Sequence, residues 1–169
     1  MKNFQASDFV DKCTARLHFE RNGVRIYEQV LSKCPERFQS RFLKILVEEQ
    51  KHVSMLEDLL TERGANPYAV TPSAKVIDIE SKSYAKAAKK TDFRELMDTV
   101  LAIELVDTVN WEILVLMAKK IGDHEAERRF RLALQEEMSH LRFIHRHVLK
   151  DLTGSTKTLR FKTKRKKAA

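Results

Sequence analysis

The feature that most constrains this chain is a carboxylate and imidazole pair that occurs twice at the same spacing. Glu49 and His52 lie three residues apart, and Glu137 and His140 repeat that spacing 88 residues later. On an α-helix, residues three apart project from the same face, one turn from each other. Each pair lies within an apolar stripe of helical periodicity, so both pairs are expected to face the interior of the fold.

A single carboxylate precedes each pair, on a different helical stripe. Glu20 interrupts the apolar stripe of residues 10–31, and Glu104 interrupts the stripe of residues 93–121, 84 residues further along the chain. The two halves of the sequence therefore match, and each half reads as a helical hairpin with an inward-facing glutamate and an inward-facing Glu-x-x-His pair. This repetition predicts a pseudo-twofold bundle.

The predicted fold is all-α, because the chain has only four Gly and three Pro and long runs of good helix formers. Helices are expected over residues 8–32, 36–63, 93–121 and 124–152. They form a four-helix bundle of two antiparallel helical hairpins. The connection over residues 64–91 is too long for a hairpin turn, so it is expected to cross the whole bundle, with a short helix near its end.

Residues 1–152 are expected to form one bundle domain, and residues 153–169 a basic, disordered tail. The tail holds seven of the basic residues and no acidic one, which leaves 25 basic and 24 acidic residues before it. Such a run can attract nucleic acid, although the bundle itself is near neutral. Cys13 and Cys34 lie 21 residues apart on or next to one helix. They are therefore too distant to bridge, and free thiols favour a cytoplasmic location. No apolar segment is long enough to suggest a membrane span or a signal peptide.

Buried carboxylates in a bundle core repel one another and need a compensating charge. A pair of metal ions supplies it, and oxygen and imidazole ligands suit iron, manganese or a mixed pair better than the thiolate-rich structural sites of zinc. Each Glu-x-x-His pair can give one histidine and one glutamate, with Glu49 and Glu137 free to bridge. Glu20 and Glu104 then complete the two coordination shells.

A single Glu-x-x-His match has a simpler explanation, because such pairs occur by chance in glutamate-rich helices. One copy alone would indicate a solvated pair or a core histidine. Two copies that each follow an inward-facing glutamate, 29 or 33 residues earlier, favour the metal interpretation.

The order of Glu, Glu-x-x-His, Glu and Glu-x-x-His resembles the ligand pattern of the ferritin-like di-iron carboxylate superfamily, over nearly the whole of residues 7–152. The rubrerythrin group is the most similar. The resemblance implies a di-iron centre whose six ligands are Glu20, Glu49, His52, Glu104, Glu137 and His140. It also implies that no haem is bound, since Gln50 and Lys51 stand where bacterioferritins place a haem-ligating methionine.

Two further residues acquire expected roles from this resemblance. Asp107 stands where rubrerythrins have a second carboxylate on the third helix, so it is either a seventh metal ligand or a hydrogen-bond partner that orients a ligand imidazole. Tyr27 stands two turns beyond Glu20, where it can hydrogen-bond a ligand or supply an electron, and core packing is the alternative. Trp111, its counterpart beyond Glu104, is expected to be a core residue.

The implied function is that of a rubrerythrin-like di-iron oxidoreductase that reduces peroxide or dioxygen, or oxidises ferrous iron. The sequence has no pair of Cys-x-x-Cys motifs for a rubredoxin domain, so the electron donor is expected to be a separate protein. A homodimer is expected rather than a closed storage shell. The alternatives are a di-iron hydroxylase acting on tRNA, an iron-binding or storage cargo protein, and a non-catalytic bundle with a vestigial site.

Overall fold

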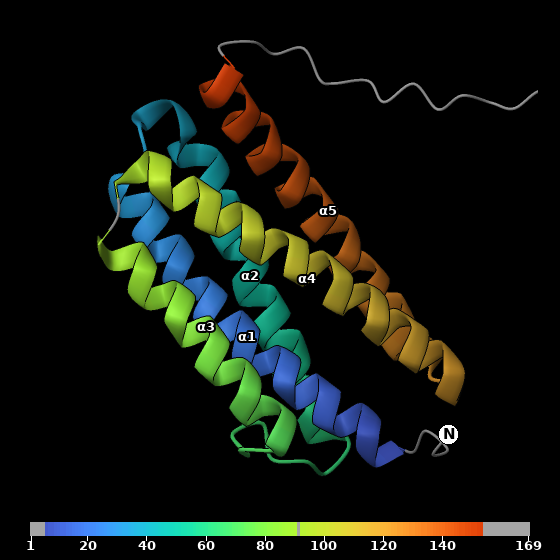
Figure 1. The fold of residues 1–169 in the computed structure, drawn as a ribbon. Helices are drawn as coiled ribbons and strands as arrows, with labels where there is room; N and C mark the ends of the chain where they lie inside the picture. The colour runs from blue at the N-terminus through green and yellow to red at the C-terminus, as the bar shows by residue number, and fades with distance from the viewer. Residues whose placement is uncertain (1–5, 91, 154–169) are drawn as a thin grey trace, which may run out of the picture.

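The computed structural model describes residues 6–90 and 92–153, and these residues are almost entirely helical (Figure 1). The helices are α1 (Ala6–Lys33), α2 (Glu36–Glu62), α3 (Pro72–Lys90), α4 (Phe93–Ile121) and α5 (His124–Thr153). No strand occurs within the described ranges, so the all-α prediction is confirmed. The predicted tail lies almost wholly outside the described residues.

The helix boundaries follow from local capping chemistry. Asp92 precedes α4, and its side chain accepts a hydrogen bond of 2.9 Å from the backbone N–H of Glu95. Gly122 ends α4 in the left-handed conformation, with φ of 75°, which a side chain would disfavour. Asp123 then accepts from the backbone N–H of Ala126 and caps α5. Pro35 separates α1 from α2, since its ring cannot continue a helix.

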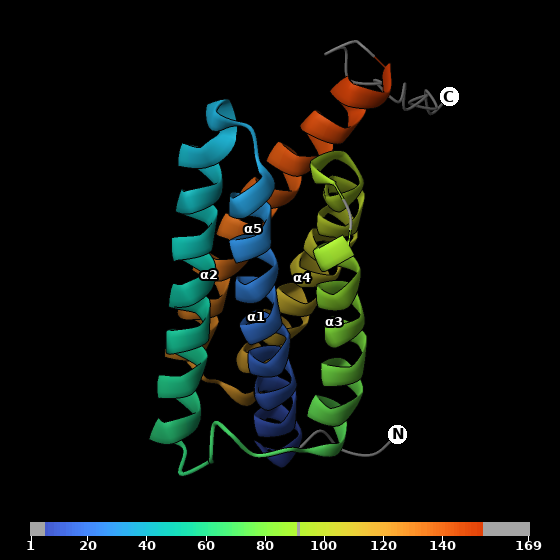
Figure 2. The same ribbon diagram turned by 90° about the vertical axis from the view of Figure 1, so that its left-hand side faces the viewer.

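The connection between the two hairpins crosses the length of the bundle, as the sequence predicts. Figure 2 shows that α3 starts at the end where α2 finishes and ends beside the turn between α1 and α2, close to the start of α4. The expected short helix is longer than predicted, because it begins at Pro72 and fills most of the crossing. Pro72 is at the first helical position, where its missing N–H costs no hydrogen bond.

Helix α1 is the central element of the fold. It packs against α2, α3 and α4, whereas α5 packs mainly against α4 and more lightly against α2. Figures 1 and 2 show α3 lying along α1 on the outside of the two hairpins. The described residues therefore form five helices, with α3 added to the four that the sequence arranges as hairpins.

The apolar core is divided into two clusters along the bundle. One contains Tyr27, Phe42 and Ile144, and the other contains Phe9, Leu56 and Trp111. On each of α1, α2, α4 and α5, the buried residues of one cluster precede the predicted ligands and those of the other follow them, with the exception of Phe19, which directly precedes Glu20. The predicted ligands therefore occupy one buried polar layer between two apolar clusters.

Two smaller expectations concern the thiols and the membrane. Cys13 and Cys34 are both buried and free, as predicted. Among the described residues, no helix combines the length and the apolar character that crossing a membrane requires.

Candidate metal centre

The six residues that the sequence assigns as ligands converge in the polar layer. Every one of them is at most 2% exposed. They form two overlapping sets of four, and within each set one ligand atom per residue lies within 4.8 Å of the others. We call them the Glu20–His52 half-site, which consists of Glu20, Glu49, His52 and Glu137, and the Glu104–His140 half-site, which consists of Glu49, Glu104, Glu137 and His140. Both sets include Glu49 and Glu137, and both could hold a metal ion.

Each of the two histidines is held by a carboxylate from the opposite hairpin. Nε2 of His52, on α2, lies 2.8 Å from Oε2 of Glu136, on α5. Nε2 of His140, on α5, lies 2.9 Å from Oε2 of Glu48, on α2. A carboxylate at Nε2 places the ring proton there and leaves Nδ1 with a lone pair that faces the centre when the imidazole is neutral.

Glu48 and Glu136 are functional candidates that the sequence interpretation missed. Both precede the shared glutamates directly, so the repeated motif is Glu-Glu-x-x-His rather than Glu-x-x-His. The hundred-degree offset between neighbours on a helix suggests that the first glutamate lies on the flank of its stripe. That flank faces the other hairpin, where the partner histidine is located. The repeated pair of adjacent glutamates was the sequence signal that could have identified both residues.

Glu20 and Glu104 each belong to only one half-site, and we call them the unshared glutamates. In each, the carboxylate oxygen that faces away from the centre is held by a hydrogen-bond donor. Oε1 of Glu20 accepts a hydrogen bond of 2.7 Å from Nε of Arg16 and lies 2.6 Å from Nη2 of the same guanidinium. Oε1 of Glu104 accepts a hydrogen bond from the Tyr27 hydroxyl. In both residues the outer oxygen has a donor, and Oε2 is directed towards the ligand atoms of its half-site.

The inward-facing atoms of the centre fit a bound cation. Eight of them make no hydrogen bond of good geometry among the described residues: Oε2 of Glu20 and of Glu104, both carboxylate oxygens of Glu49 and of Glu137, and Nδ1 of His52 and of His140. Nδ1 of His52 nevertheless lies 3.0 Å from Oε1 of Glu137, and Nδ1 of His140 lies 3.3 Å from Oε1 of Glu49, so protonated imidazoles can pair with these carboxylates when no metal is bound. Buried polar atoms without partners are costly and rare in proteins. Their convergence in two sets of four is the arrangement that coordination by metal ions would satisfy.

Asp107 is 1% exposed and forms an ion pair with Nη2 of Arg16. It belongs to neither four-residue set among the described residues. Its contact with the centre is therefore indirect, through Arg16 to Glu20, an arrangement that the sequence interpretation did not consider. The role of Asp107 as a seventh ligand stays a prediction.

Tyr27 and Trp111 occupy equivalent places on α1 and α4. Both are buried, and each lies seven residues beyond the unshared glutamate of its helix. Tyr27 contacts Glu104, and the Trp111 ring lies with its centroid 5.3 Å from that of His52. Each helical hairpin thus directs an aromatic side chain to the half-site that contains the other hairpin's unshared glutamate and histidine.

The protonation of the centre reflects how closely its charges are placed. Burial raises the pKa of Glu104 to about 8, and the charge of Glu137 acts in the same direction. Burial raises the pKa of Glu49 as well. Burial opposes ionisation of Glu137, but His140 and His52 outweigh it and lower the pKa. Burial also acts against a charged His140, yet the adjacent Glu137 and Glu49 raise its pKa to about 12. Without a metal ion, protons therefore balance the charge of the cluster.

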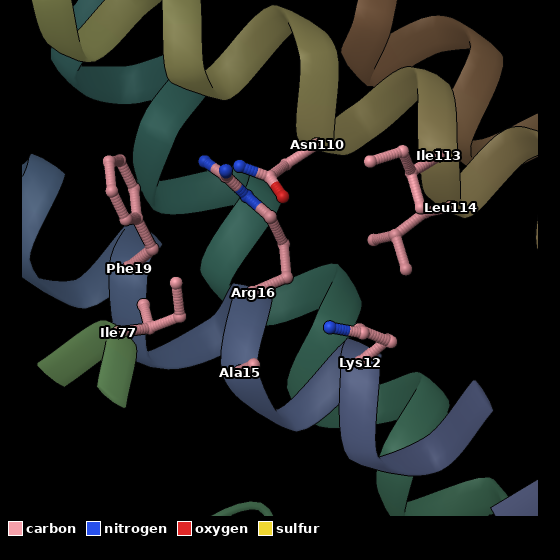
Figure 3. A pocket seen from close by; sticks show the side chains of 8 residues that line it. All are labelled: Lys12, Ala15, Arg16, Phe19, Ile77, Asn110, Ile113 and Leu114. Carbon is pink, nitrogen blue, oxygen red and sulfur yellow. The ribbon is translucent and has the colours of Figure 1, made fainter. Parts of the chain in front are cut away.

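A small pocket lies beside Arg16, and its lining does not include any of the six candidate ligands. It lies between α1, α3 and α4, has a volume of about 40 Å³ and can admit a few water molecules. Figure 3 shows Arg16 extending from α1 towards α4, between Phe19 and Asn110, with Lys12 on the same helix. Arg16 thus lines the pocket and contacts the ligand candidate Glu20 at the same time.

The site consists of four carboxylates and two imidazoles in two sets that share Glu49 and Glu137, and each set could hold a metal ion. None of the protein family models, the curated proteins or the solved structures matches this chain.

Proposed function

We propose that this protein is a di-iron oxidoreductase of the ferritin-like type, most similar to the rubrerythrins. It would reduce peroxide or dioxygen, or oxidise ferrous iron, at the buried centre. The observation that carries the proposal is the convergence of two four-residue sets that share Glu49 and Glu137, since shared carboxylates can bridge a pair of metal ions.

The donor set favours iron, with manganese or a mixed pair as the other candidates. All donors are carboxylate oxygens and imidazole nitrogens, and no cysteine is in either half-site. Zinc prefers thiolate or histidine-rich sites, whereas carboxylates tolerate the change of charge that accompanies iron oxidation. Four ligand carboxylates offset the charge of two divalent ions. A bound iron pair would supply the redox chemistry by alternating between its ferrous and ferric states.

The path of the chain supports the ferritin-like assignment. A connection that crosses the bundle joins the hairpin of α1 and α2 to the hairpin of α4 and α5 (Figure 2). Because of this crossing, α4 starts at the end of the bundle opposite to the one where α2 finishes, whereas a short turn would have kept it at the same end. The ligands follow the chain order Glu20, Glu49 with His52, Glu104, and Glu137 with His140. In this family that order accompanies that connectivity.

The surrounding residues would orient the ligands and exclude water. Glu48 and Glu136 fix the imidazole rings, and the apolar clusters on either side shield the layer from solvent. The Tyr27 hydroxyl keeps its proton, because burial and the charge of Glu104 raise the pKa of the phenol. That proton is donated to Oε1 of Glu104, which places an oxidisable side chain in direct contact with a ligand.

The partners of this reaction stay predictions. Electrons are expected from a separate donor protein, the oxidant is a small molecule, and the assembly is expected to be a homodimer in the cytoplasm. Light scattering of the purified protein would measure the mass of the assembly, and a monomer would contradict the expected dimer.

Anaerobic loading with ferrous iron tests the proposal. About two irons should bind per chain, and mixing with peroxide or with dioxygen should produce an optical change as the iron is oxidised. His140→Gln should lower the iron content, whereas His145→Gln, at an exposed position of the same helix, should leave it unchanged. A chain that binds no iron, or whose bound iron reacts with neither oxidant, would rule out the proposed function.

A further inference from the structure

The two half-sites share the same plan but differ in the charge of the donor that contacts the unshared glutamate. Each contains an unshared glutamate whose outer oxygen is held by a donor, and a histidine whose Nε2 is held by a glutamate. For Glu104 the donor is the neutral phenol of Tyr27, while for Glu20 it is the guanidinium of Arg16. Arginine stays charged in any protein environment, so among the described residues a fixed positive charge directly contacts a candidate ligand carboxylate only in the Glu20–His52 half-site. On the other side, the ammonium of Lys44 lies 3.4 Å from Glu48, behind His140, but its side chain is 63% exposed and solvent screens it.

Arg16 is built into the structure rather than resting on its surface. It is 4% exposed, and its guanidinium lies 4.7 Å from the ring centroid of Phe19 and 5.4 Å from that of Trp111. Asp107 pairs with Nη2 and offsets the charge in part, but the guanidinium stands between Asp107 and Glu20. The positive end of this ion pair therefore faces the ligand carboxylate.

A guanidinium in this position would weaken cation binding in two ways. It repels the cation directly, and this repulsion is poorly screened in a buried site. It also occupies Oε1 of Glu20 with two nitrogens, which leaves Oε2 as the oxygen that can bind metal. Tyr27 occupies Oε1 of Glu104 in the same manner, but it adds no net charge.

The carboxylates behind the two histidines add to the difference. The side chain of Glu136, which holds His52, is 37% exposed, whereas that of Glu48, which holds His140, is 10% exposed. Solvent screens the more exposed pair more strongly, so His52 is fixed less firmly than His140.

We propose that the half-sites bind divalent metal with unequal affinity, that the Glu104–His140 half-site fills first, and that Arg16 causes most of the difference. This inference rests on the proposed metal-binding function. The metal of the Glu20–His52 half-site is then the more easily exchanged one. When metal is scarce, it occupies the Glu104–His140 half-site instead of being shared equally between the two half-sites.

Titration of the metal-free full chain with Mn²⁺ tests the inference, with free Mn²⁺ followed by electron paramagnetic resonance. Two steps are expected, and the second should be about 10–100-fold weaker than the first. His140→Gln should remove the tight step and His52→Gln the weak one. Two ions bound with the same affinity, or loss of the tight step in His52→Gln, would overturn the inference. No bound Mn²⁺ at all would instead argue against the metal centre itself.

Variants of Arg16 identify the cause of the difference. Arg16→Gln should strengthen the second step about tenfold and leave the first unchanged, whereas Arg16→Lys keeps the charge and should keep the two steps apart. If Arg16→Gln fails to fold, as circular dichroism would show, Arg16→Gln with Asp107→Asn removes both charges and should bring the steps together in the same way. The role of Arg16 would be overturned if the ratio of the two affinities were unchanged in the folded neutral variants. It would also be overturned if Arg16→Lys reduced that ratio as much as Arg16→Gln does.

Discussion

Nε2 of His140 on α5 lies 2.9 Å from Oε2 of Glu48 on α2, and the equivalent distance from His52 to Glu136 is 2.8 Å. Each hairpin therefore supplies the carboxylate that orients the other hairpin's histidine. This reciprocal arrangement joins the two Glu-Glu-x-x-His motifs into one unit, because neither imidazole is fixed by its own hairpin alone. The centre depends on correct docking of both hairpins.

Replacing Glu48 should weaken metal binding without removing any ligand. Glu48→Leu deletes the acceptor for the Nε2 proton of His140, and we expect the affinity for Mn²⁺ to fall about 10–100-fold. Glu48→Gln retains an acceptor oxygen and should lose less. Glu112→Gln, on the exposed face of α4, is the control. Equal affinities in Glu48→Leu and the control would mean that this contact does not tune the centre.

The hydroxyl of Tyr27 should matter for both stability and oxidation. Tyr27→Phe leaves Oε1 of Glu104 buried without its donor, so the free energy of unfolding of the metal-free protein should fall by about 1–3 kcal/mol. If Tyr27 supplies an electron, the variant should bind iron normally but react more slowly with peroxide. Tyr68→Phe is the control, because that ring is 70% exposed. A variant with unchanged stability and rate would reduce Tyr27 to a packing residue.

Helical periodicity made the ligand layer predictable from the sequence. A residue's place on a helical stripe determines the face on which it lies, and the short turns at Pro35 and Gly122 set the depth to which each hairpin returns. These local rules place Glu20 level with Glu49 and Glu104 level with Glu137, and the repeated pattern predicts that the two hairpins meet at that level. The length of α3 was less predictable, because its packing along α1, which the sequence does not show, stabilises it.

The charged neighbours of the ligands were harder to predict. Arg16 lies four residues before Glu20, a spacing that also occurs on solvated helix faces. Only the position of α4 brings Asp107 to its other side and makes the arginine a buried residue. Whether a carboxylate binds metal or pairs with a cation thus depends on a contact between helices that the sequence does not reveal.

Metal binding should release protons. At pH 7 the metal-free centre holds protons on Glu104, whose pKa is about 8, and on His140, whose pKa is about 12. Ligands must lose these protons to bind metal, so the affinity should rise with pH. Calorimetric titration in buffers with different ionisation enthalpies measures the number released. A binding heat that is independent of the buffer would show that the ligands are already deprotonated.

Glu104→Gln should increase the stability of the metal-free protein while weakening metal binding. Because the folded pKa of Glu104 is about 8 and its ordinary value is 4.5, the folded chain holds a proton that the unfolded chain loses within that range. The free energy of unfolding therefore falls as the pH rises from 4.5 to 8. Above pH 8, ionisation of the buried Glu104 lowers it by on the order of a few kcal/mol.

Glutamine keeps an oxygen that can accept from Tyr27 but has no charge, so the variant should lack most of this pH dependence. Urea unfolding of metal-free protein at pH 5 and pH 8 measures the difference, with Glu112→Gln as the control. A Glu104→Gln variant that is less stable than the parent at pH 8 would mean that the buried carboxylate stabilises the fold. The expected result is the opposite, since burial and the charge of Glu137 both disfavour the ionised form of this carboxylate.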